Sequence, residues 1–160
     1  MKNALFTCGL AFCAVLMMPS LFSCASIGGS KAVFSDVTEI NWALSEIRSG
    51  KSTVAIDRQK YEADNMGNFF TITFQGDRVN GVAAPNRYFG PFTQSEDKNL
   101  SFGNLASTLM AAFREPAELN EHEYMTYLSK VTRWDLKKGK LELYTSNSSG
   151  AETVLVYTQQ

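Results

Sequence analysis

The chain has 160 residues, of which 44% are hydrophobic and 19% are charged, and its formal net charge is −1. The near-neutral balance, with no run or stripe of basic residues, excludes the electrostatic footprint of a nucleic-acid-binding protein. The length suits one ordinary domain. A domain of this size buries a sufficient core without disulfide bonds or a structural metal ion.

The first 23 residues are predicted to be a signal peptide that is removed from the mature protein. Lys2 supplies a short positive region, and residues 4–18 form an uncharged, mainly apolar run. This run is too short, and Pro19 follows it too closely, for a membrane-spanning helix. Residues 21–24 (LFSC) then resemble the lipobox of bacterial lipoproteins, in which the cysteine thiolate takes up a diacylglyceryl group. A plain secretory signal is the alternative.

The positions of the cysteines agree with lipid attachment at Cys24. Cys8 and Cys13 lie in the segment to be removed, so the mature chain keeps one cysteine and no disulfide partner for it. Three acyl chains on the first mature residue would hold the protein firmly at a membrane. The residue after the anchor is Ala25 and not an aspartate. In enteric lipoproteins, the absence of aspartate at this position indicates the outer membrane. We therefore predict a lipid-anchored envelope protein, on the outer membrane and facing the periplasm or the cell surface.

The mature chain is predicted to consist of a flexible tether over residues 24–38 and one domain over residues 39–160. The start of the tether is small, polar and glycine-bearing. Alternating apolar and polar residues in the domain favour strands, with Trp42 facing the core. The predicted strands are 40–47, 53–56, 69–74, 78–83, 87–93, 100–102, 134–136, 141–144 and 153–157. Residues 57–68 read as a polar loop that allows a helical turn, and the pattern over 106–113 fits a helix or a strand.

One helix is predicted over residues 121–131. Asn120 is a suitable N-cap, Glu123 stands at the spacing of a capping box, and the first turn carries two acidic residues. The apolar residues of one helix face are Tyr124, Leu128 and Val131. The elements together predict a mainly β domain of the α+β class.

Six short motifs follow one another in a fixed order. They are the strand with Trp42, RVNG at 78–81, NRYFG at 86–90, LASTLMA at 105–111, the helix end Tyr127-Leu128, and LEL at 141–143. In this order they resemble the META domain, the family of the heat-shock protein HslJ, from about Ile40 to Tyr157. The resemblance implies a small antiparallel barrel-like sheet with one packed helix, here in a bacterial lipoprotein member. It also implies an envelope protein, in a family whose molecular activity is mostly undefined.

The chain departs from the family pattern at two cysteine positions. The family commonly reads G-C-N where this chain has residues 84–86 (APN), so Pro85 replaces a cysteine. It commonly reads T-R-M-A-C where this chain has residues 108–112 (TLMAA), so Leu109 replaces an arginine and Ala112 a cysteine. The paired loss fits a disulfide or a contact that this chain does without. No role of those family residues is transferred here.

The sequence holds no set of residues with the spacing of a catalytic or metal site. His122 is the only histidine, and the second histidine that a zinc-protease helix needs is absent at position 126. His122 is expected in solvent, opposite the Leu128 face of the helix, so we also exclude Ser/His/Asp and Cys/His catalysis, which would have to use this same residue. Residues 50–52 (GKS) are predicted to be a turn, because a strand follows them. Glu62, Asp64 and Asn65 lack the ligand spacing of a calcium loop. We predict no catalytic, cofactor-binding or metal-binding residue.

Two groups of residues allow both a structural and a binding interpretation. The acidic group is most simply the favourable start of the predicted helix. It consists of Glu115, Glu118, Glu121 and Glu123. The other group lies on one strand, where alternate side chains point to opposite sides. Tyr88 and Phe92 should therefore face one side and Arg87 and Phe89 the other, with the inward pair packed in the core.

The expected function is non-catalytic binding, related to envelope stress or to the support of another envelope component. Two alternatives are a small barrel that carries an apolar ligand or lipid and an inhibitor of a wall-degrading hydrolase that uses the loop 94–99. A cavity lined by apolar side chains would favour the carrier, and a filled interior would favour the others. The predicted partners are the membrane, through the lipid anchor, and an envelope protein or a small apolar ligand, but no nucleic acid.

Overall fold

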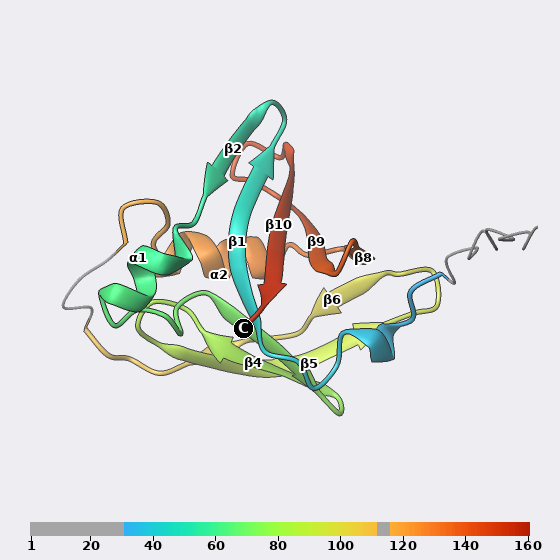
Figure 1. Cartoon of the computed structure of the whole chain (residues 1–160). Helices are drawn as coiled ribbons and strands as arrows, with labels where there is room; N and C mark the ends of the chain where they lie inside the picture. The colour runs from blue at the N-terminus through green and yellow to red at the C-terminus, as the bar shows by residue number, and fades with distance from the viewer. Residues whose placement is uncertain (1–30, 112–115) are drawn as a thin grey trace, which may run out of the picture. The chain divides into compact units, whose positions relative to one another are not determined.

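The computed structural model describes residues 31–111 and 116–160, and the described part contains ten strands and three short helices (Figure 1). The strands are β1 (Trp42–Ser49), β2 (Ser52–Ala55), β3 (Thr71–Gln75), β4 (Arg78–Val82), β5 (Arg87–Gln94), β6 (Leu100–Phe102), β7 (Ala106–Ser107), β8 (Arg133–Lys137), β9 (Lys140–Ser146) and β10 (Glu152–Gln159). The helices are η1 (Phe34–Asp36), α1 (Arg58–Ala63) and α2 (Glu121–Ser129).

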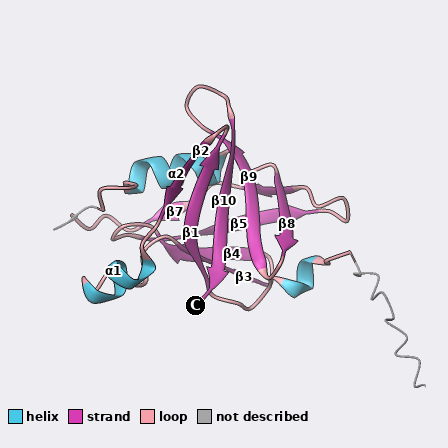
Figure 2. Ribbon diagram, turned by 45° about the horizontal axis from the view of Figure 1, so that its top comes forward, coloured by secondary structure: helices cyan, strands magenta, loops and turns pink. Residues whose placement is uncertain are grey.

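The strands form one antiparallel sheet in the order β6-β5-β4-β3-β1-β10-β9-β8, with β2 beside β1 and β7 beside β5. The sheet curls into a nearly closed barrel (Figure 2). At the seam between β6 and β8, the Leu100 N–H donates to the Thr132 carbonyl and the Trp134 N–H donates to the Lys98 carbonyl, both at 3.0 Å. The seam leaves little unpaired strand edge. The predicted mainly β, barrel-like antiparallel sheet with one packed helix is therefore confirmed.

Large side chains fill the interior of the barrel. The side chains that are at most 2% exposed include Trp42, Trp134, Tyr61, Tyr88, Tyr124, Tyr157, Phe70 and Phe74. Trp42 faces the core, as its alternation pattern predicts, and its Nε1–H donates to the Val37 carbonyl at 2.9 Å. Burial of a large apolar side chain contributes about 2–3 kcal/mol, so this aromatic set is the main stabilising element of the domain.

Helix α2 joins the core through tyrosine hydroxyls as well as apolar contacts. The Tyr124 hydroxyl lies 3.1 Å from the Tyr157 hydroxyl and 3.3 Å from the Tyr88 hydroxyl, which itself donates to the Thr71 carbonyl at 2.8 Å. The predicted N-cap is also present, since the Asn120 side chain accepts the backbone N–H of the third helical residue at 2.8 Å. The helix ends two residues earlier than the predicted 131.

The predicted strands all lie within two residues of observed ones at either end. The tight turn between β8 and β9 consists of Lys138 and Gly139, both with positive φ (52° and 74°), as a two-residue hairpin turn requires. The loop over 57–68 contains α1. The ambiguous segment over 106–113 begins with the short strand β7, continues without regular structure to residue 111, and then leaves the described residues.

The folded part begins before the predicted boundary at residue 39. Val37 is fully buried, and the Phe34 ring lies 5.2 Å from both the Phe74 and Trp134 rings. These two apolar side chains close one end of the core, so residues 34–38 belong to the domain and not to a tether. Residues 24–30 of the predicted tether lie outside the described residues.

Candidate functional site

The structure does not bring the chemically reactive candidates of the sequence together. His122 is exposed on α2, and Gly50 turns the chain between β1 and β2 with φ at 58°. Within residues 31–111 and 116–160, no group of three or more His, Cys, Asp or Glu side chains is placed to hold a metal ion. Cys24, the predicted lipid-attachment residue, lies outside the described residues. In the described part of the chain, no helix is both long enough and apolar enough to cross a bilayer.

The acidic residues around the start of α2 each have a separate hydrogen-bond partner. Glu118 accepts from the Tyr61 hydroxyl at 3.2 Å, and Glu121 accepts from the Asn86 amide at 2.8 Å. Glu123 accepts from the Tyr127 hydroxyl at 2.9 Å; burial and this carboxylate raise the pKa of Tyr127 to about 12. These three side chains stabilise the fold individually. Glu115 lies outside the described residues.

Strand β5 follows the predicted alternation. Tyr88 is buried, and Phe92 packs against the core from the same side. Arg87 and Phe89 point outward, and the Phe89 side chain remains 45% exposed. The Arg78 guanidinium lies 5.5 Å from the centre of the Phe89 ring, a cation–π contact that orients the ring on the surface.

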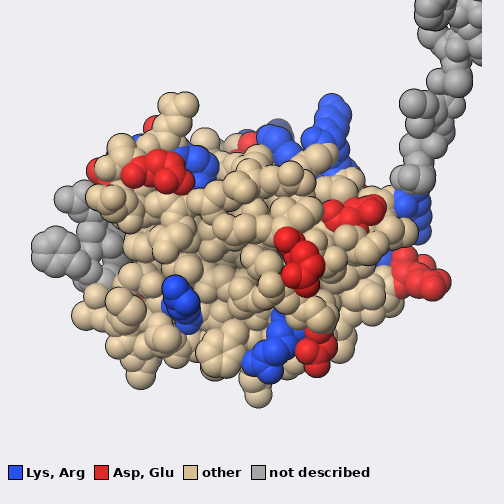
Figure 3. Space-filling view, turned by 60° about the horizontal axis from the view of Figure 1, so that its bottom comes forward, with Lys and Arg blue, Asp and Glu red and all other residues tan. Residues whose placement is uncertain are grey.

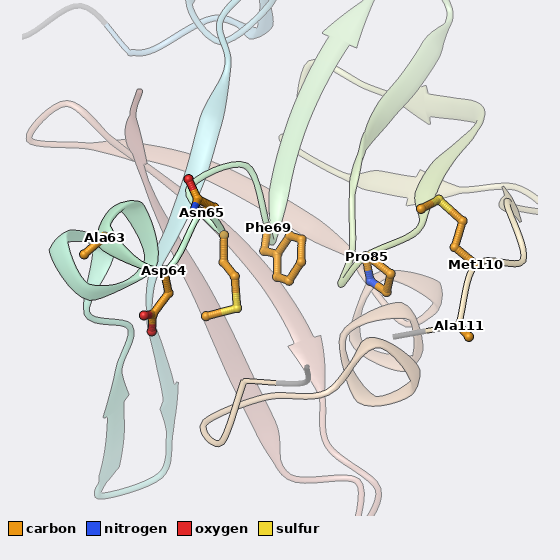
Figure 4. Close-up of a pocket in the computed structure, with 8 residues that line it drawn as sticks. Ala63, Asp64, Asn65, Phe69, Pro85, Met110 and Ala111 are labelled. Carbon is orange, nitrogen blue, oxygen red and sulfur yellow. The ribbon is translucent and has the colours of Figure 1, made fainter. Parts of the chain in front are cut away.

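An open pocket of about 500 Å³ lies beside α1 (Figure 4). Three separate parts of the chain line it: the end of α1 with the loop after it, the turn after β4, and the segment after β7. The lining residues are Ala63, Asp64, Asn65, Met66, Phe69, Pro85, Met110 and Ala111. The volume is in the range of small-molecule and peptide side-chain sites, and most of the lining is apolar.

Hydrogen bonds fix two of the pocket's walls. Asn86 accepts the Met110 N–H at 2.7 Å and donates to the Met110 carbonyl at 3.1 Å, so its buried amide holds the segment after β7 like a neighbouring strand. Arg58 donates to the Phe69 carbonyl at 2.9 Å and to the Gly67 carbonyl, which fixes the loop after α1. The pocket is therefore part of the folded domain.

The rim of the pocket exposes apolar side chains. Leu109 is 98% exposed and Met110 is 60% exposed, whereas large apolar side chains elsewhere in the described chain are mostly buried. An exposed apolar group beside an apolar pocket is typical of a binding surface, and methionine adapts to differently shaped partners. Sequence reasoning did not find this site, although two of the departures from the family motifs lie at it or next to it: Pro85 lines the pocket, and Leu109 directly precedes the lining residue Met110.

The outer side of β8, β9, β10 and β1 carries an ionic cluster around Glu142. Glu142 itself is only 6% exposed. Its carboxylate accepts from the Tyr144 hydroxyl at 2.6 Å, from Lys137 at 3.0 Å and from Arg48. Burial alone would raise the pKa of Glu142, but these three hydrogen bonds outweigh burial and lower the pKa to about 2. Glu142 is therefore a fully bonded structural anion at neutral pH.

The cluster extends to neighbouring charges that are also paired. Asp135 accepts from Lys98 and lies 3.6 Å from Lys137, and Glu46 lies 3.2 Å from Arg48. Burial would raise the pKa of Asp135, but the hydrogen bond from Lys98 and the backbone N–H of Leu136 lower it. These charges are bonded to one another, which favours a structural role for the cluster.

The tyrosines inside the barrel are not acid–base groups at neutral pH. Burial raises the pKa of Tyr124 to about 12 and raises the pKa values of Tyr88 and Tyr157 well above the ordinary value for tyrosine. All three remain neutral and exchange hydrogen bonds. Their role is to connect α2 to β5 and β10 across the core.

Comparisons with known proteins agree with this architecture. The chain is similar in structure to a protein from Burkholderia xenovorans solved by NMR, with a TM-score of 0.57 and 20% identity over 83% of this chain and 96% of that one. It is also similar to a DUF4847 family protein from Bacteroides vulgatus, with a TM-score of 0.55 and 12% identity over 79% of this chain and 96% of that one. At these identities the likeness concerns the fold. No curated protein matches the chain. The model of the META domain matches residues 35–160, and the chain therefore belongs to the META domain family.

Proposed function

We propose that this META domain protein is a non-catalytic envelope lipoprotein, anchored through Cys24, that binds another envelope protein with the apolar pocket beside α1. By supporting that partner, the protein contributes to envelope stress tolerance. The anchor is supported by the signal-like residues 4–18 and the lipobox-like residues 21–24. The binding role is supported by the exposed apolar side chains beside the pocket.

The observation that carries the binding role is the exposure of Met110, which lines the pocket together with Met66, Phe69 and Pro85, and of Leu109, the residue before it. Leaving apolar side chains in water is unfavourable by about 25 cal/mol per Å² of apolar area, so a partner that covers them gains free energy. An apolar side chain of a protein partner suits a pocket of about 500 Å³ that is open on one side.

The two alternative functions have weaker support. A barrel that carries a lipid inside needs an empty interior, and aromatic side chains such as Trp42, Phe70 and Tyr157 occupy this one. A hydrolase inhibitor needs a projecting loop, but the loop 94–99 is attached to β8: the Lys98 carbonyl accepts the Trp134 N–H at 3.0 Å and the Lys98 side chain pairs with Asp135.

The anchor is tested by the variant Cys24→Ala, followed by partition between detergent and aqueous phases. We expect the wild type in the detergent phase and the variant unprocessed or in the aqueous phase, because the variant has no thiolate to acylate. Normal processing and detergent partition of Cys24→Ala would contradict lipid attachment at this residue.

The binding site is tested by placing a photo-crosslinking amino acid at Leu109 in the full chain and irradiating intact cells. The matched control position is Val54 on β2, which is also apolar and 39% exposed, but neither it nor its chain neighbours line the pocket, whereas Leu109 adjoins the lining residue Met110. We expect one discrete protein adduct from position 109, confirmed by crosslinking back from the partner, and none from position 54. Met110→Asp in the same chain should abolish the adduct, because a carboxylate opposes burial in an apolar contact.

Three results would contradict the proposal. They are equal adducts from positions 109 and 54, an adduct that Met110→Asp does not affect, and an adduct with lipid in place of protein. The last result would favour the apolar-ligand alternative, with the ligand held at the outer pocket. The thermal unfolding of Met110→Asp serves as the folding control and should match the wild type, because residue 110 is 60% exposed.

A further inference from the structure

A second surface lies on the outer side of β3, β4 and β5, and it differs in chemistry from the apolar pocket. Thr73 pairs with Asn80 across β3 and β4, and Asn80 pairs with Phe89 across β4 and β5. The flanking side chains Ile72, Phe74, Val79 and Tyr88 are buried in the core, so Thr73, Asn80 and Phe89 form one row on the outside. We call this row, with Asn41 at its β1 end, the amide platform.

A shallow depression of about 430 Å³ covers the amide platform. Figure 3, which brings the side of β4 and β5 forward, shows that most of this face is uncharged, with only isolated acidic and basic groups. The cations on β3, β4 and β5 are Arg78 and Arg87. The face therefore repels neither a neutral nor an anionic ligand, and it has no acidic cluster to attract a cationic one.

Hydrogen bonds between side chains hold the amides in place. The Thr73 hydroxyl donates to Asn41 at 3.3 Å, and Asn41 donates to the side chain of Gln160 at 2.8 Å. Asn80 donates to Gln75 at 3.2 Å. An asparagine amide offers two donors and two acceptor lone pairs, so within the described residues each amide keeps donor and acceptor capacity for a ligand.

From this arrangement we infer that the amide platform binds a glycan chain. A sugar ring has an apolar face of C–H groups and an edge of hydroxyl groups that both donate and accept. The Phe89 ring, which remains 45% exposed with the Arg78 guanidinium 5.5 Å from its centre, matches the first, and the row of amide and hydroxyl groups matches the second. A purely apolar ligand would leave the amides unpaired, and a nucleic acid would need more basic groups than this face has.

The ligand needs several hydroxyl-bearing rings. The row runs from Asn41, the residue before β1, across β3 and β4 to Phe89 on β5, and neighbouring strands lie about 4.8 Å apart, so the platform is longer than one sugar ring. A chain of rings stacked on Phe89 at one end reaches Asn80 and Thr73 with its next rings. Binding to an open surface of this kind should be weak, with Kd on the order of 1 mM.

The experiment is saturation-transfer difference NMR with the full chain in a sugar-free detergent. Chitotetraose is the probe with acetamido groups, and maltotetraose is the probe with hydroxyl groups alone. We expect transfer to at least one of them, and the preferred probe identifies the class of glycan. Phe89→Leu and Asn80→Ala should each weaken binding about tenfold, whereas Phe89→Tyr should retain it because a flat aromatic ring remains.

Thr93→Ala is the matched control, because Thr93 lies on the same outward side of β5 as Phe89 but beyond the depression. It should bind the probe as the wild type does. Met110→Asp should also leave the probe bound, which separates this inference from the proposed protein-binding pocket. The inference is overturned by no transfer to either probe at about 10 mM, by transfer that Phe89→Leu and Asn80→Ala leave unchanged, or by transfer that Met110→Asp abolishes.

Discussion

On the β8–β9–β10–β1 side of the barrel the outward charges are bonded to one another, whereas on the β3–β4–β5 side the outward polar groups face solvent with bonding capacity left. Glu142 accepts three hydrogen bonds and is 6% exposed. Asn80 makes one side-chain bond, to Gln75, within the described residues and stands beside the 45% exposed Phe89. The two sides have the same strand geometry, so the difference lies in which side chains the strands carry.

This difference teaches how a structural polar cluster is distinguished from a binding surface. A polar group that contributes to stability has its hydrogen bonds completed inside the protein, and its loss leaves a partner unpaired. A polar group that serves binding is oriented by one or two bonds and leaves the others for the ligand. The first kind should be sensitive to substitution in unfolding experiments, and the second kind in binding experiments.

The largest expected effect is that of Glu142→Ala. Removing the carboxylate leaves Arg48 and Lys137 without their shared anion. Because these two side chains are 40% and 52% exposed and water can solvate them, the free energy of unfolding should fall by about 3 kcal/mol, the low end of the range for a buried ion pair. Urea unfolding at neutral pH measures this change. Glu152→Ala, an exposed carboxylate on β10, is the control and should change stability by less than about 0.5 kcal/mol. Equal effects of the two variants would remove the distinction between the two sides.

The pH dependence of stability should report the same carboxylate. The folded-state pKa of Glu142 is about 2, below its ordinary value of 4.5. A carboxylate whose pKa is lower in the folded state than in the unfolded state stabilises the protein when the pH is above the unfolded-state pKa. This stabilisation is lost as the pH falls through 4.5 toward 2. The loss should be about 3 kcal/mol larger for the wild type than for Glu142→Gln in urea unfolding across that range. Parallel pH profiles for the two proteins would contradict the assignment.

A smaller effect is expected in the interior. Tyr124→Phe removes the hydroxyl that links Tyr88 and Tyr157, and the free energy of unfolding should fall by about 1.5 kcal/mol. Thermal and urea unfolding measure the loss. Tyr127→Phe should cost less, because the Tyr127 hydroxyl reaches the exposed Glu123 near the surface. If Tyr127→Phe were the more harmful of the two, the buried hydroxyl group would not be the link between α2 and the barrel.

The smallest stability effect is expected on the amide platform. Asn80→Ala and Thr73→Ala should each change the free energy of unfolding by less than about 0.5 kcal/mol, because neither leaves a fully buried group unpaired. The same chemical unfolding experiment applies. A loss comparable to that of Glu142→Ala would mean that the platform is a structural cluster like the one on the other side.

Most of the fold was predictable because its signals are local. Alternation identified the strand with Trp42, the Lys138-Gly139 pair identified a two-residue turn, and Asn120 identified the start of α2. The contribution of Phe34 and Val37 to the core was not predictable. Both lie next to a run of small and polar residues, and the ring partners of Phe34, which are Phe74, Phe92 and Trp134, come from distant strands.

Less of the candidate site was predictable, because its parts are brought together only by tertiary contacts. Alternation placed Phe89 and Tyr88 on opposite sides of the strand but left open which of them faces the core; the structure buries Tyr88 and exposes Phe89. The pocket, however, joins the loop after α1 to Pro85 and Met110, which are separated in sequence. Glu142 stands between Leu141 and Leu143, and the sequence analysis did not single it out. Its burial depends on Arg48 and Lys137, which no local pattern connects to it.

The most direct test of the account is hydrogen exchange of the full chain in isolated native envelopes, compared with the purified chain in detergent. The account predicts added protection in peptides over 63–69 and 106–111, which line the pocket, and unchanged exchange in peptides over 133–146 of β8 and β9. Added protection over 133–146 alone, or identical exchange everywhere in the two preparations, would contradict the claim that the protein works through the pocket and not through its ion-paired side.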